Sequence, residues 1–323
     1  MPILKNLNYR TKSIIDSLDA EQRIELGIKT ILGPKNILLL DFGADQPGTL
    51  AAGKLLAEIC LAGLGTVSID MGQQSQMPLP SVSVFTDHPL AACIASQYAG
   101  WPVSTSDYFA MGSGPARMLR GQEDLLERYQ LRENSEQAVV VLESKELPTS
   151  TAVDLLGDDC GIAPDMLTVC IARTASLPGT IQIVARSIET TMHKLAELGF
   201  DLQSVLSASG SAPLPPIGVD DLQSVGWTND AIILGSRVML WVNSDDDLIE
   251  ATGKRLPSNV SLDFGRPFIE IFESYDRDFY KIDKLLFSPA QVTINNIRSG
   301  RSWTFGEVHL KLLLQSIGLG SSK

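Results

Sequence analysis

The sequence predicts an α+β protein made of two mixed α/β domains with a cleft between them. Three observations lead to this prediction. The chain has 323 residues, about twice the length of a typical domain. Helical and strand-like patterns follow one another without the regular β-α-β rhythm of a doubly wound sheet. The nucleotide-binding patterns GxGxxG and GxxxxGK[ST] do not occur, so the common nucleotide folds lack their main sequence support.

Composition and charge narrow the class of protein. Hydrophobic residues make up 44% of the chain and charged residues 20%, which is ordinary for a globular protein with a sizeable core. There are 38 acidic and 26 basic side chains, giving a net charge of −12, and no run of Lys or Arg forms a basic face. Nucleic acid is therefore not expected as a partner.

The sequence shows no targeting or membrane segment. Its first residues contain no sustained apolar stretch followed by a small-residue cleavage site. Nowhere do about 18 consecutive apolar residues occur. The cysteines lack the CxxC spacing of metal and redox sites and lie in apolar surroundings: Cys60, Cys93, Cys160 and Cys170. We therefore expect a soluble cytoplasmic protein with free, buried thiols and no membrane partner.

The histidines give no metal-binding pattern. His88, His193 and His309 are widely separated, and none stands in an HxxxH or HxH arrangement. The acidic run Asp245–Asp247 lacks the alternating ligands and the glycine of a calcium loop, so it is expected to form a turn. No protein-bound catalytic metal is predicted.

In the first part of the chain, apolar periodicity predicts helices and strands in turn. Asp19 is expected to cap the first helix, and glycines at 63 and 65 are placed to end a later one. The expected elements are a helix at Asp19–Ile31, a strand at Ile37–Leu40, a helix at Thr49–Leu64, strands at Val67–Met71 and Ser81–Thr86, and a helix at Leu90–Tyr98.

A buried strand is expected at Gln137–Leu142, and Pro148 after it marks the candidate domain boundary. We therefore place an N-terminal α+β domain at 1–150 and a C-terminal α+β domain at 151–323, and allow the chain to cross between them more than once. The later elements expected are a strand at Leu167–Ala172, a turn at Ser176–Gly179, a helix at Val184–Leu195, an irregular loop at Ser207–Pro216, and strands at Ala231–Leu240 and Pro267–Phe272.

The helix expected at Val184–Leu195 carries an unusual polar stripe. Arg186, Glu189 and His193 are spaced three and four residues apart and share one face, with Gln182 just before them. The apolar residues fall on a separate arc: Ile181, Val184, Ile188, Met192 and Leu195. Two interpretations follow. The stripe is either a solvated face, with an ion pair worth about 0.3–0.5 kcal/mol, or the lining of a functional cleft.

Two further stretches suggest ligand contacts but have structural alternatives. In GSGPAR, residues 112–117, Ser113, Gly114 and Arg117 could hold an anion, or the glycines and proline could form a tight turn before a helix. The G-x-S-x-G pattern of a serine nucleophile is absent. In GWTND, Asn229 and Asp230 could bind a heterocycle or could cap a helix.

Taken together and in order, several blocks carry a family resemblance. They are GSGPAR (112–117), Cys160-Gly161, the segment 182–194, Ala212-Pro213-Leu214-Pro215-Pro216, Thr228-Asn229-Asp230, Gly265-Arg266-Pro267-Phe268, Asp278-Phe279-Tyr280 and Phe287-Ser288-Pro289-Ala290. With these blocks the chain resembles the methenyltetrahydromethanopterin cyclohydrolases, a family of methanogenic archaea and of bacteria that oxidise one-carbon units. The resemblance covers about Leu7 to Ser316. The chain departs from the family pattern at Trp227, where a basic residue would be expected.

The resemblance implies a hydrolase of one-carbon metabolism that acts on a cyclic amidine C–N bond. It would open the 5,10-methenyl bridge of tetrahydromethanopterin reversibly to the 5-formyl compound, with the carrier as substrate and no metal or redox cofactor. The resemblance also implies a homo-oligomer, often a trimer, with the pterin held between the two domains of each subunit.

The same resemblance assigns roles to single residues. Glu189 matches the glutamate that deprotonates the attacking water, and Arg186 matches an arginine that would orient this carboxylate and polarise the water. Arg117 is expected to meet the anionic tail of the carrier, with bracing of an interface as the alternative. The expected substrate-binding residues are Ser113, Gly114, Arg117, Gln182, Asn229 and Asp230.

Two other functions stay open from the sequence. One is a non-catalytic or divergent pterin-binding paralogue, which Trp227 favours and which the presence of both Arg186 and Glu189 disfavours. The other is a cyclohydrolase for another one-carbon carrier, such as tetrahydrofolate.

Overall fold

A computed structural model of the chain describes residues 6–71 and 77–319, which fold into two compact units. Unit 1 takes the chain up to Gly65 and the segment Ala91–Gln182, and unit 2 takes Thr66–Leu90 and the chain from Ile183 onward. The chain therefore passes between units three times. Both units combine helices with a mixed sheet, which confirms the α+β prediction. The cleft between domains stays a prediction.

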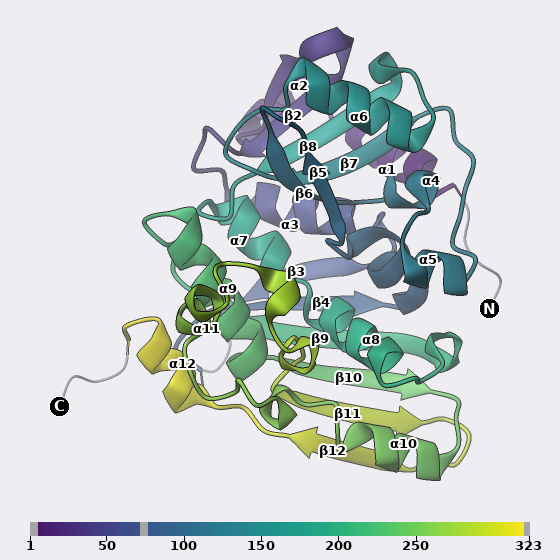
Figure 1. Cartoon of the computed structure of the whole chain (residues 1–323), viewed down its shortest axis with the longest axis vertical. Helices are drawn as coiled ribbons and strands as arrows, with labels where there is room; N and C mark the ends of the chain where they lie inside the picture. Colours follow the sequence, from purple (N-terminus) through teal and green to yellow (C-terminus); the bar gives the residue numbers. More distant parts are fainter. Residues whose placement is uncertain (1–5, 72–76, 320–323) are drawn as a thin grey trace. The chain divides into compact units, whose positions relative to one another are not determined.

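Unit 1 is built on a six-stranded sheet, sheet A (Figure 1). Its three central strands run parallel, and its outer strands pair antiparallel. The strand order is β1 (Lys29–Leu32), β2 (Leu38–Gly43), β8 (Leu167–Ala172), β7 (Ala138–Glu143), β6 (Phe109–Ser113) and β5 (Trp101–Ser104). Residue 150 lies inside this unit, because α6 (Ser150–Cys160) connects the neighbouring parallel strands β7 and β8. Pro148 thus marks a connection within one sheet rather than the boundary expected there.

Alternate residues of the central strands pack into two separate hydrophobic cores, one on each side of sheet A. Leu39, Val140 and Ile171 pack on one side of sheet A with residues of α6. The neighbouring residues pack on the other side with α1 (Leu7–Asp16) and α3 (Leu50–Cys60). Since both sides are buried, these strands read as continuous apolar runs, and this is why the sequence predicted β7 and β8 well.

Unit 2 contains a second six-stranded sheet, sheet B, which is mostly antiparallel. Only β10 and β11 pair in parallel. The strand order is β12 (Ser302–Gly306), β11 (Gln291–Asn296), β10 (Arg237–Val242), β9 (Val205–Pro213), β4 (Ser81–Thr86) and β3 (Thr66–Asp70).

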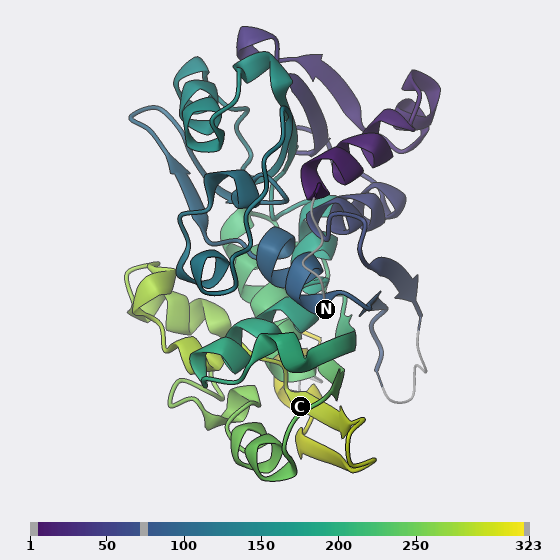
Figure 2. The same cartoon turned by 90° about the vertical axis from the view of Figure 1, so that its right-hand side faces the viewer.

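Helices gather on one side of sheet B, as Figures 1 and 2 show. Contacts with the strands come from α8 (Ser187–Glu197), α9 (Asp221–Gly235) and α10 (Asp246–Gly253), and α11 (Phe268–Ser274) and α12 (Leu310–Ser316) pack on α9. Residues pointing to the other side remain partly open to solvent. Phe85 is 44% exposed and Met239 is 39% exposed. The two faces follow the period-two alternation of a half-buried antiparallel sheet.

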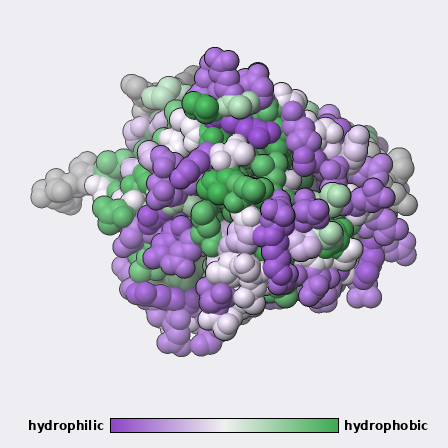
Figure 3. Space-filling model, turned by 90° about the horizontal axis from the view of Figure 1, so that it is seen from above, coloured by the Kyte–Doolittle hydropathy of each residue, from purple (hydrophilic) through white to green (hydrophobic). Residues whose placement is uncertain are grey.

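The remaining short elements complete the chain. They are α2 (Ala20–Glu25), η1 (Pro34–Asn36), the π-helix η2 (Leu90–Gln97), α4 (Arg117–Arg120), α5 (Asp124–Arg128), η3 (Pro164–Met166), α7 (Leu177–Val184), η4 (Leu202–Ser204), η5 (Ser258–Val260), η6 (Phe279–Lys281) and η7 (Lys284–Leu286). The face drawn in Figure 3 is largely hydrophilic, with hydrophobic residues gathered near its centre. None of the described helices combines the length and apolar character needed to span a membrane.

Several predicted elements are confirmed, and one near the N-terminus is shorter than expected. Asp19 caps α2 by accepting the Gln22 N–H at 2.8 Å, as predicted. The helix ends early because Gly27 adopts a left-handed conformation, with φ of 74°, and β1 then starts at Lys29. The strands expected near 37–40, 67–71, 81–86, 137–142 and 167–172 and the helices near 49–64 and 90–98 are present. The four cysteines are free and buried, as expected.

The loop predicted at Ser207–Pro216 is wrong over most of its length, because β9 extends to Pro213 as a central strand of sheet B. Its serines, alanines and glycine have low intrinsic strand preference. The small residues serve packing instead. A Cβ atom added at Gly210 would lie 2.5 Å from Ser187 Oγ and 2.9 Å from Ile188 Cγ1, so only glycine lets α8 approach this strand.

Two predicted strands and one predicted turn are also corrected. Residues up to Gly235 of the strand expected at Ala231–Leu240 belong to α9, and only its second half is β10. The strand expected at Pro267–Phe272 is α11, which begins after Pro267 and whose first N–H is accepted by Asp230 Oδ1 at 2.9 Å. The acidic run near 245 begins α10 instead of forming a turn.

Candidate functional site

The predicted polar stripe lies on α8 and its N-cap residue, whereas Gln182 before it belongs to α7. The chain leaves α7 after Val184, and α8 starts at Ser187 with Arg186 as its N-cap residue. The turn expected at Ser176–Gly179 is instead the start of α7, which begins at Leu177. The Thr190 N–H donates to Arg186 O at 2.9 Å and so begins the hydrogen-bond ladder of α8. Glu189 therefore lies in the first turn of a helix, where the helix dipole favours a negative charge.

The burial of this helix start argues against the solvated-face interpretation of the stripe. Arg186 and Glu189 are each only 5% exposed. A solvated ion pair is therefore the wrong description of these two side chains. One turn later the stripe differs, because the His193 side chain is 17% exposed and its Nε2 lies 4.0 Å from Glu197 Oε1.

Local packing fixes the start of α8 within unit 2. Gly210 of β9 makes room for the side chains of Ser187 and Ile188. The Thr191 hydroxyl donates to Ser187 O at 2.8 Å, which ties the first turn to the next. Because Glu189 follows these residues by one or two positions, the same contacts place its carboxyl group.

In unit 1, two predicted site residues meet at a third residue that sequence reasoning did not select. Ser113 ends β6, Gln182 lies in α7, and Cys60 ends α3. The Cys60 Sγ lies 4.0 Å from Ser113 Oγ and donates to Gln182 Oε1 at 3.8 Å. Cys60 stands 53 and 122 positions from these partners, so no local pattern could have revealed the group.

Gly114 has a structural reason to be glycine. Its φ is +92°, and an added Cβ would lie 3.1 Å from Val139 O and 3.3 Å from Val141 N. Its N–H donates to Ser96 O at 2.8 Å. These contacts support the tight-turn interpretation of GSGPAR.

Arg117 is fully buried in unit 1, where protein groups take up its guanidinium. The guanidinium forms a two-point ion pair with the carboxylate of Glu123, and Nη1 donates to Ile94 O at 2.7 Å. Its Cζ also lies 4.9 Å from the centre of the Tyr98 ring. The geometry gives no support to contact with an anionic tail, and it favours the bracing alternative within the unit.

Asn229 and Asp230 make structural contacts in α9. The Asn229 amide donates to Val225 O at 2.8 Å, along its own helix. Asp230 is 2% exposed, and its Oδ1 accepts the Phe268 N–H at 2.9 Å. Burial raises the pKa of Asp230 to about 7, against the lowering effect of this hydrogen bond. Its carboxyl group therefore changes charge near neutral pH.

The departure at Trp227 also has a structural explanation. The indole Nε1–H donates to Ser316 O at 3.1 Å and so joins α9 to the end of α12. This use of the tryptophan needs no loss of catalytic function.

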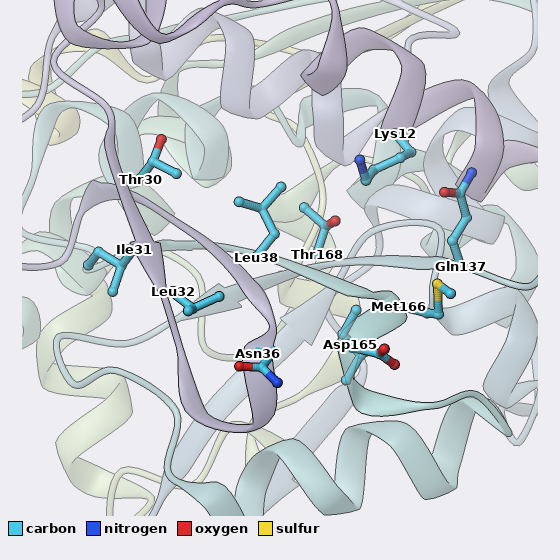
Figure 4. A pocket seen from close by; sticks show the side chains of 11 residues that line it. Lys12, Thr30, Ile31, Leu32, Asn36, Leu38, Gln137, Asp165, Met166 and Thr168 are labelled. Atoms are coloured by element: carbon cyan, nitrogen blue, oxygen red, sulfur yellow. The ribbon is translucent and has the colours of Figure 1, made fainter.

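A surface cavity of about 380 Å³ lies apart from all these residues (Figure 4). It is at the beginning of the parallel strands β2 and β8 in unit 1, whereas open α/β sheets bind ligands at the carboxyl ends of their strands. Its lining residues are Lys12, Thr30, Ile31, Leu32, Asn36, Leu38, Gln137, Asp165, Met166, Leu167 and Thr168. None of the predicted site residues is among them.

Within residues 6–71 and 77–319, His, Cys, Asp and Glu side chains form no group of three that could hold a metal ion. The chemistry available in the described residues is that of a buried carboxyl group with a buried guanidinium three residues before it. Such a pair can accept a proton from water and orient the water for attack.

Comparison with known proteins supplies the family. A family model described as Cyclohydrolase (MCH) matches residues 6–317. A methenyltetrahydromethanopterin cyclohydrolase of Rhodopirellula baltica is 44% identical over 295 residues, covering 90% of this chain and 88% of the relative. Proteins of the same name are 42% identical in Methanospirillum hungatei, with 87% and 89% covered, and 37% identical in Methanothermobacter thermautotrophicus, with 97% and 99% covered.

Proposed function

This chain belongs to the methenyltetrahydromethanopterin cyclohydrolase family, and we propose that it hydrolyses 5,10-methenyltetrahydromethanopterin reversibly to 5-formyltetrahydromethanopterin. It is a hydrolase that acts on a cyclic amidine C–N bond. The observation that carries the assignment of its site is the burial of Arg186 and Glu189 at the start of α8.

In the proposed mechanism, Glu189 acts as the general base. The methenyl carbon is already electrophilic because it lies between two nitrogens that share a positive charge. Glu189 takes a proton from water as the oxygen attacks this carbon. The tetrahedral adduct then collapses, the bond from carbon to N10 breaks, and N10 receives the proton from Glu189. Loss of the hydroxyl proton leaves the formyl group on N5, so one proton is released overall.

Arg186 has an orienting role in this proposal. Its position three residues before Glu189, at the N-cap of the same helix, keeps the two groups in a geometry set by one helical turn. A fixed cation beside the base matters most when the water begins to attack, because charge develops there in the transition state.

The contacts in each unit refine the substrate-binding residues. We retain Ser113 and Gln182, which meet at Cys60 in unit 1. Gly114 and Arg117 would act indirectly by holding the strand and helix around Ser113. Asn229 and Asp230 would contribute indirectly, by holding α11 in its packing position on α9.

Three further features belong to the proposal. The carrier is the substrate, and no other cofactor takes part. The protein is cytoplasmic, which its free, buried cysteines support. It forms a homo-oligomer, with a trimer as the expected state, and the exposed Phe85 and Met239 on the open face of sheet B support such an assembly. Sedimentation velocity of the purified protein measures the assembly.

The test of the catalytic assignment is the loss of methenyl absorbance with purified protein, with the tetrahydromethanopterin and tetrahydrofolate carriers compared. The nearly isosteric Glu189→Gln variant should bind the carrier and keep the fold but turn over about two to four orders of magnitude more slowly. His193→Gln, one turn further on the same helix and more exposed, is the matched control and should retain nearly full turnover. A Glu189→Gln protein with native turnover would show that another group is the base.

A further inference from the structure

Four phenylalanines form a cluster in unit 2 that the catalytic assignment does not use. They are Phe268, Phe272, Phe279 and Phe287. The Phe279 ring centre lies 4.4 Å from that of Phe272, 5.8 Å from that of Phe268 and 6.2 Å from that of Phe287. Three neighbouring rings therefore hold Phe279 in one orientation.

The members of the cluster differ in their exposure to solvent. Phe268 is fully buried and Phe272 is 7% exposed, whereas Phe279 is 40% exposed. Scattered exposed apolar side chains are normal on proteins, so exposure alone would carry no conclusion. Here the exposed ring rests on buried rings, which makes it a rigid flat surface. A planar ligand can stack on such a surface with little loss of side-chain entropy.

The segment that carries this cluster is fastened to the helix that carries Glu189. Lys194 of α8 is fully buried, and its Nζ donates to Pro257 O at 3.0 Å and to Leu285 O at 2.5 Å. Both carbonyls belong to the excursion between α10 and β11, which we call the 257–289 excursion. Ser258 N–H donates to Pro289 O at 3.1 Å, so the two ends of the excursion meet beside α8.

Lys194 makes this link without a carboxylate. Both hydrogen bonds of its Nζ go to backbone carbonyls. Burial lowers the pKa of Lys194 to about 7, with Asp283 raising it and Arg255 lowering it further. The link does not depend on the protonation state, because a neutral amine keeps two N–H groups for the two carbonyls.

The distances along the chain connect the exposed ring with the candidate base. Leu285, which accepts from Lys194, is two residues before Phe287 of the cluster. On α8, Lys194 follows Glu189 by five residues, which is about 7.5 Å along the helix axis and about 140° around it, so the helix backbone and not a shared face connects the two side chains. Phe279, the 257–289 excursion and Glu189 thus belong to one connected arrangement within unit 2.

We propose that the exposed face of Phe279 stacks on a planar ring of the pterin carrier. Lys194 is the positioning residue, because it holds the excursion that carries Phe279 at a fixed position relative to Glu189. This inference rests on the proposed function, since it takes a flat heteroaromatic substrate as given. Stacking of this kind contributes to carrier binding and leaves the chemical step to Glu189 and Arg186. Its loss should appear in KM and not in kcat.

The first experiment compares variants of Phe279 in steady-state kinetics with the methenyl carrier. Phe279→Ala should raise KM about three- to tenfold with kcat unchanged, and Phe279→Trp should keep KM at or below the native value. Phe279→Leu keeps the apolar bulk without the flat face, and it should resemble Phe279→Ala. The matched control is Phe109→Ala, which removes a ring of unit 1 that is 61% exposed, and it should leave KM unchanged.

The second experiment tests Lys194 by a double-mutant cycle. Lys194→Met removes both hydrogen bonds to the excursion and should raise KM by a similar factor. In a protein that already carries Phe279→Ala, Lys194→Met should raise KM little further, because the stacking face is already gone. A structural role of Lys194 unrelated to Phe279 would make the two effects multiply.

The outcomes separate this inference from the function on which it rests. A native protein that hydrolyses neither methenyl carrier would refute the proposed function. A native protein that is active while Phe279→Leu and Phe279→Ala keep the native KM would refute the stacking role and leave the function standing. Multiplying effects in the double mutant would refute the positioning role of Lys194 alone.

Discussion

The buried carboxyl group of Asp230 should give the protein a pH-dependent stability that an Asp230→Asn variant lacks. Burial raises the pKa of this carboxyl from 3.8 to about 7 in the folded protein. In the unfolded chain it ionises at its ordinary pKa. Between these two values the folded protein keeps a proton that the unfolded chain has released. The free energy of unfolding therefore falls as pH rises through this window and levels off above the folded-state pKa.

The size of the effect follows from proton linkage. Well inside the window, each pH unit lowers the free energy of unfolding by about 1.4 kcal/mol, and the slope halves as pH reaches the folded-state pKa, so the carboxyl accounts for about 2 kcal/mol between pH 5 and pH 7. An asparagine keeps an oxygen that can accept the Phe268 N–H and has no proton to lose in this range. The stability of the variant relative to the native protein should thus rise by about 2 kcal/mol across the same interval.

Urea unfolding of both proteins at pH 5, 6, 7 and 8 measures this difference. Comparing changes with pH cancels any constant effect of the substitution and any titration that the two proteins share. Asp165→Asn, which alters an exposed aspartate of unit 1, is the control and should show no comparable rise. If the native and Asp230→Asn curves stay parallel from pH 5 to pH 8, the carboxyl ionises normally in the folded protein and the reasoning fails.

Three further substitutions test the candidate site and the residues that support it. Arg117→Met should lower the free energy of unfolding by about 3–5 kcal/mol, because Glu123 loses its buried partner. Urea unfolding measures this loss. A salt-dependent rise in KM at native stability would instead indicate that Arg117 binds the anionic tail of the carrier. Gly210→Ala should cost about 1–3 kcal/mol and lower kcat, because its Cβ would displace the start of α8, whereas Ser209→Ala should do neither in the same assays. Arg186→Ala should lower kcat more than it changes KM, and equal changes in both constants would contradict an orienting role.

The fold was predictable from the sequence where a residue's surroundings follow from its neighbours in the chain. Strand β8 is bounded as expected because its apolar run is buried on both sides of sheet A. Strand β9 was missed because its small residues are explained only by α8, which comes from an earlier part of the chain. The first turn of α11 was taken for a strand because its apolar pattern is short, and the Asp230 contact that caps it lies 38 residues away.

The candidate site shows the same division. The spacing of Arg186 and Glu189 was visible in the sequence, but the helix break at Arg186 and the burial of both side chains depend on packing against β9. Arg117 was assigned a ligand because an arginine after a glycine-rich stretch suggests an anion site. Its partner Glu123 is six residues away, beyond the helical spacing that marks an ion pair in sequence.

Arg186 and Glu189 lie together in unit 2, at the start of one helix. Arg186 and Glu189 both follow the last passage of the chain between units, at Gln182 and Ile183. Their mutual geometry is therefore set by the first turn of α8 and by Gly210 beneath it. Ser113 and Gln182 belong to unit 1, where Cys60 joins them. In the proposed mechanism, the base Glu189 and the orienting Arg186 therefore keep their mutual distance when the carrier binds, since one rigid element carries both.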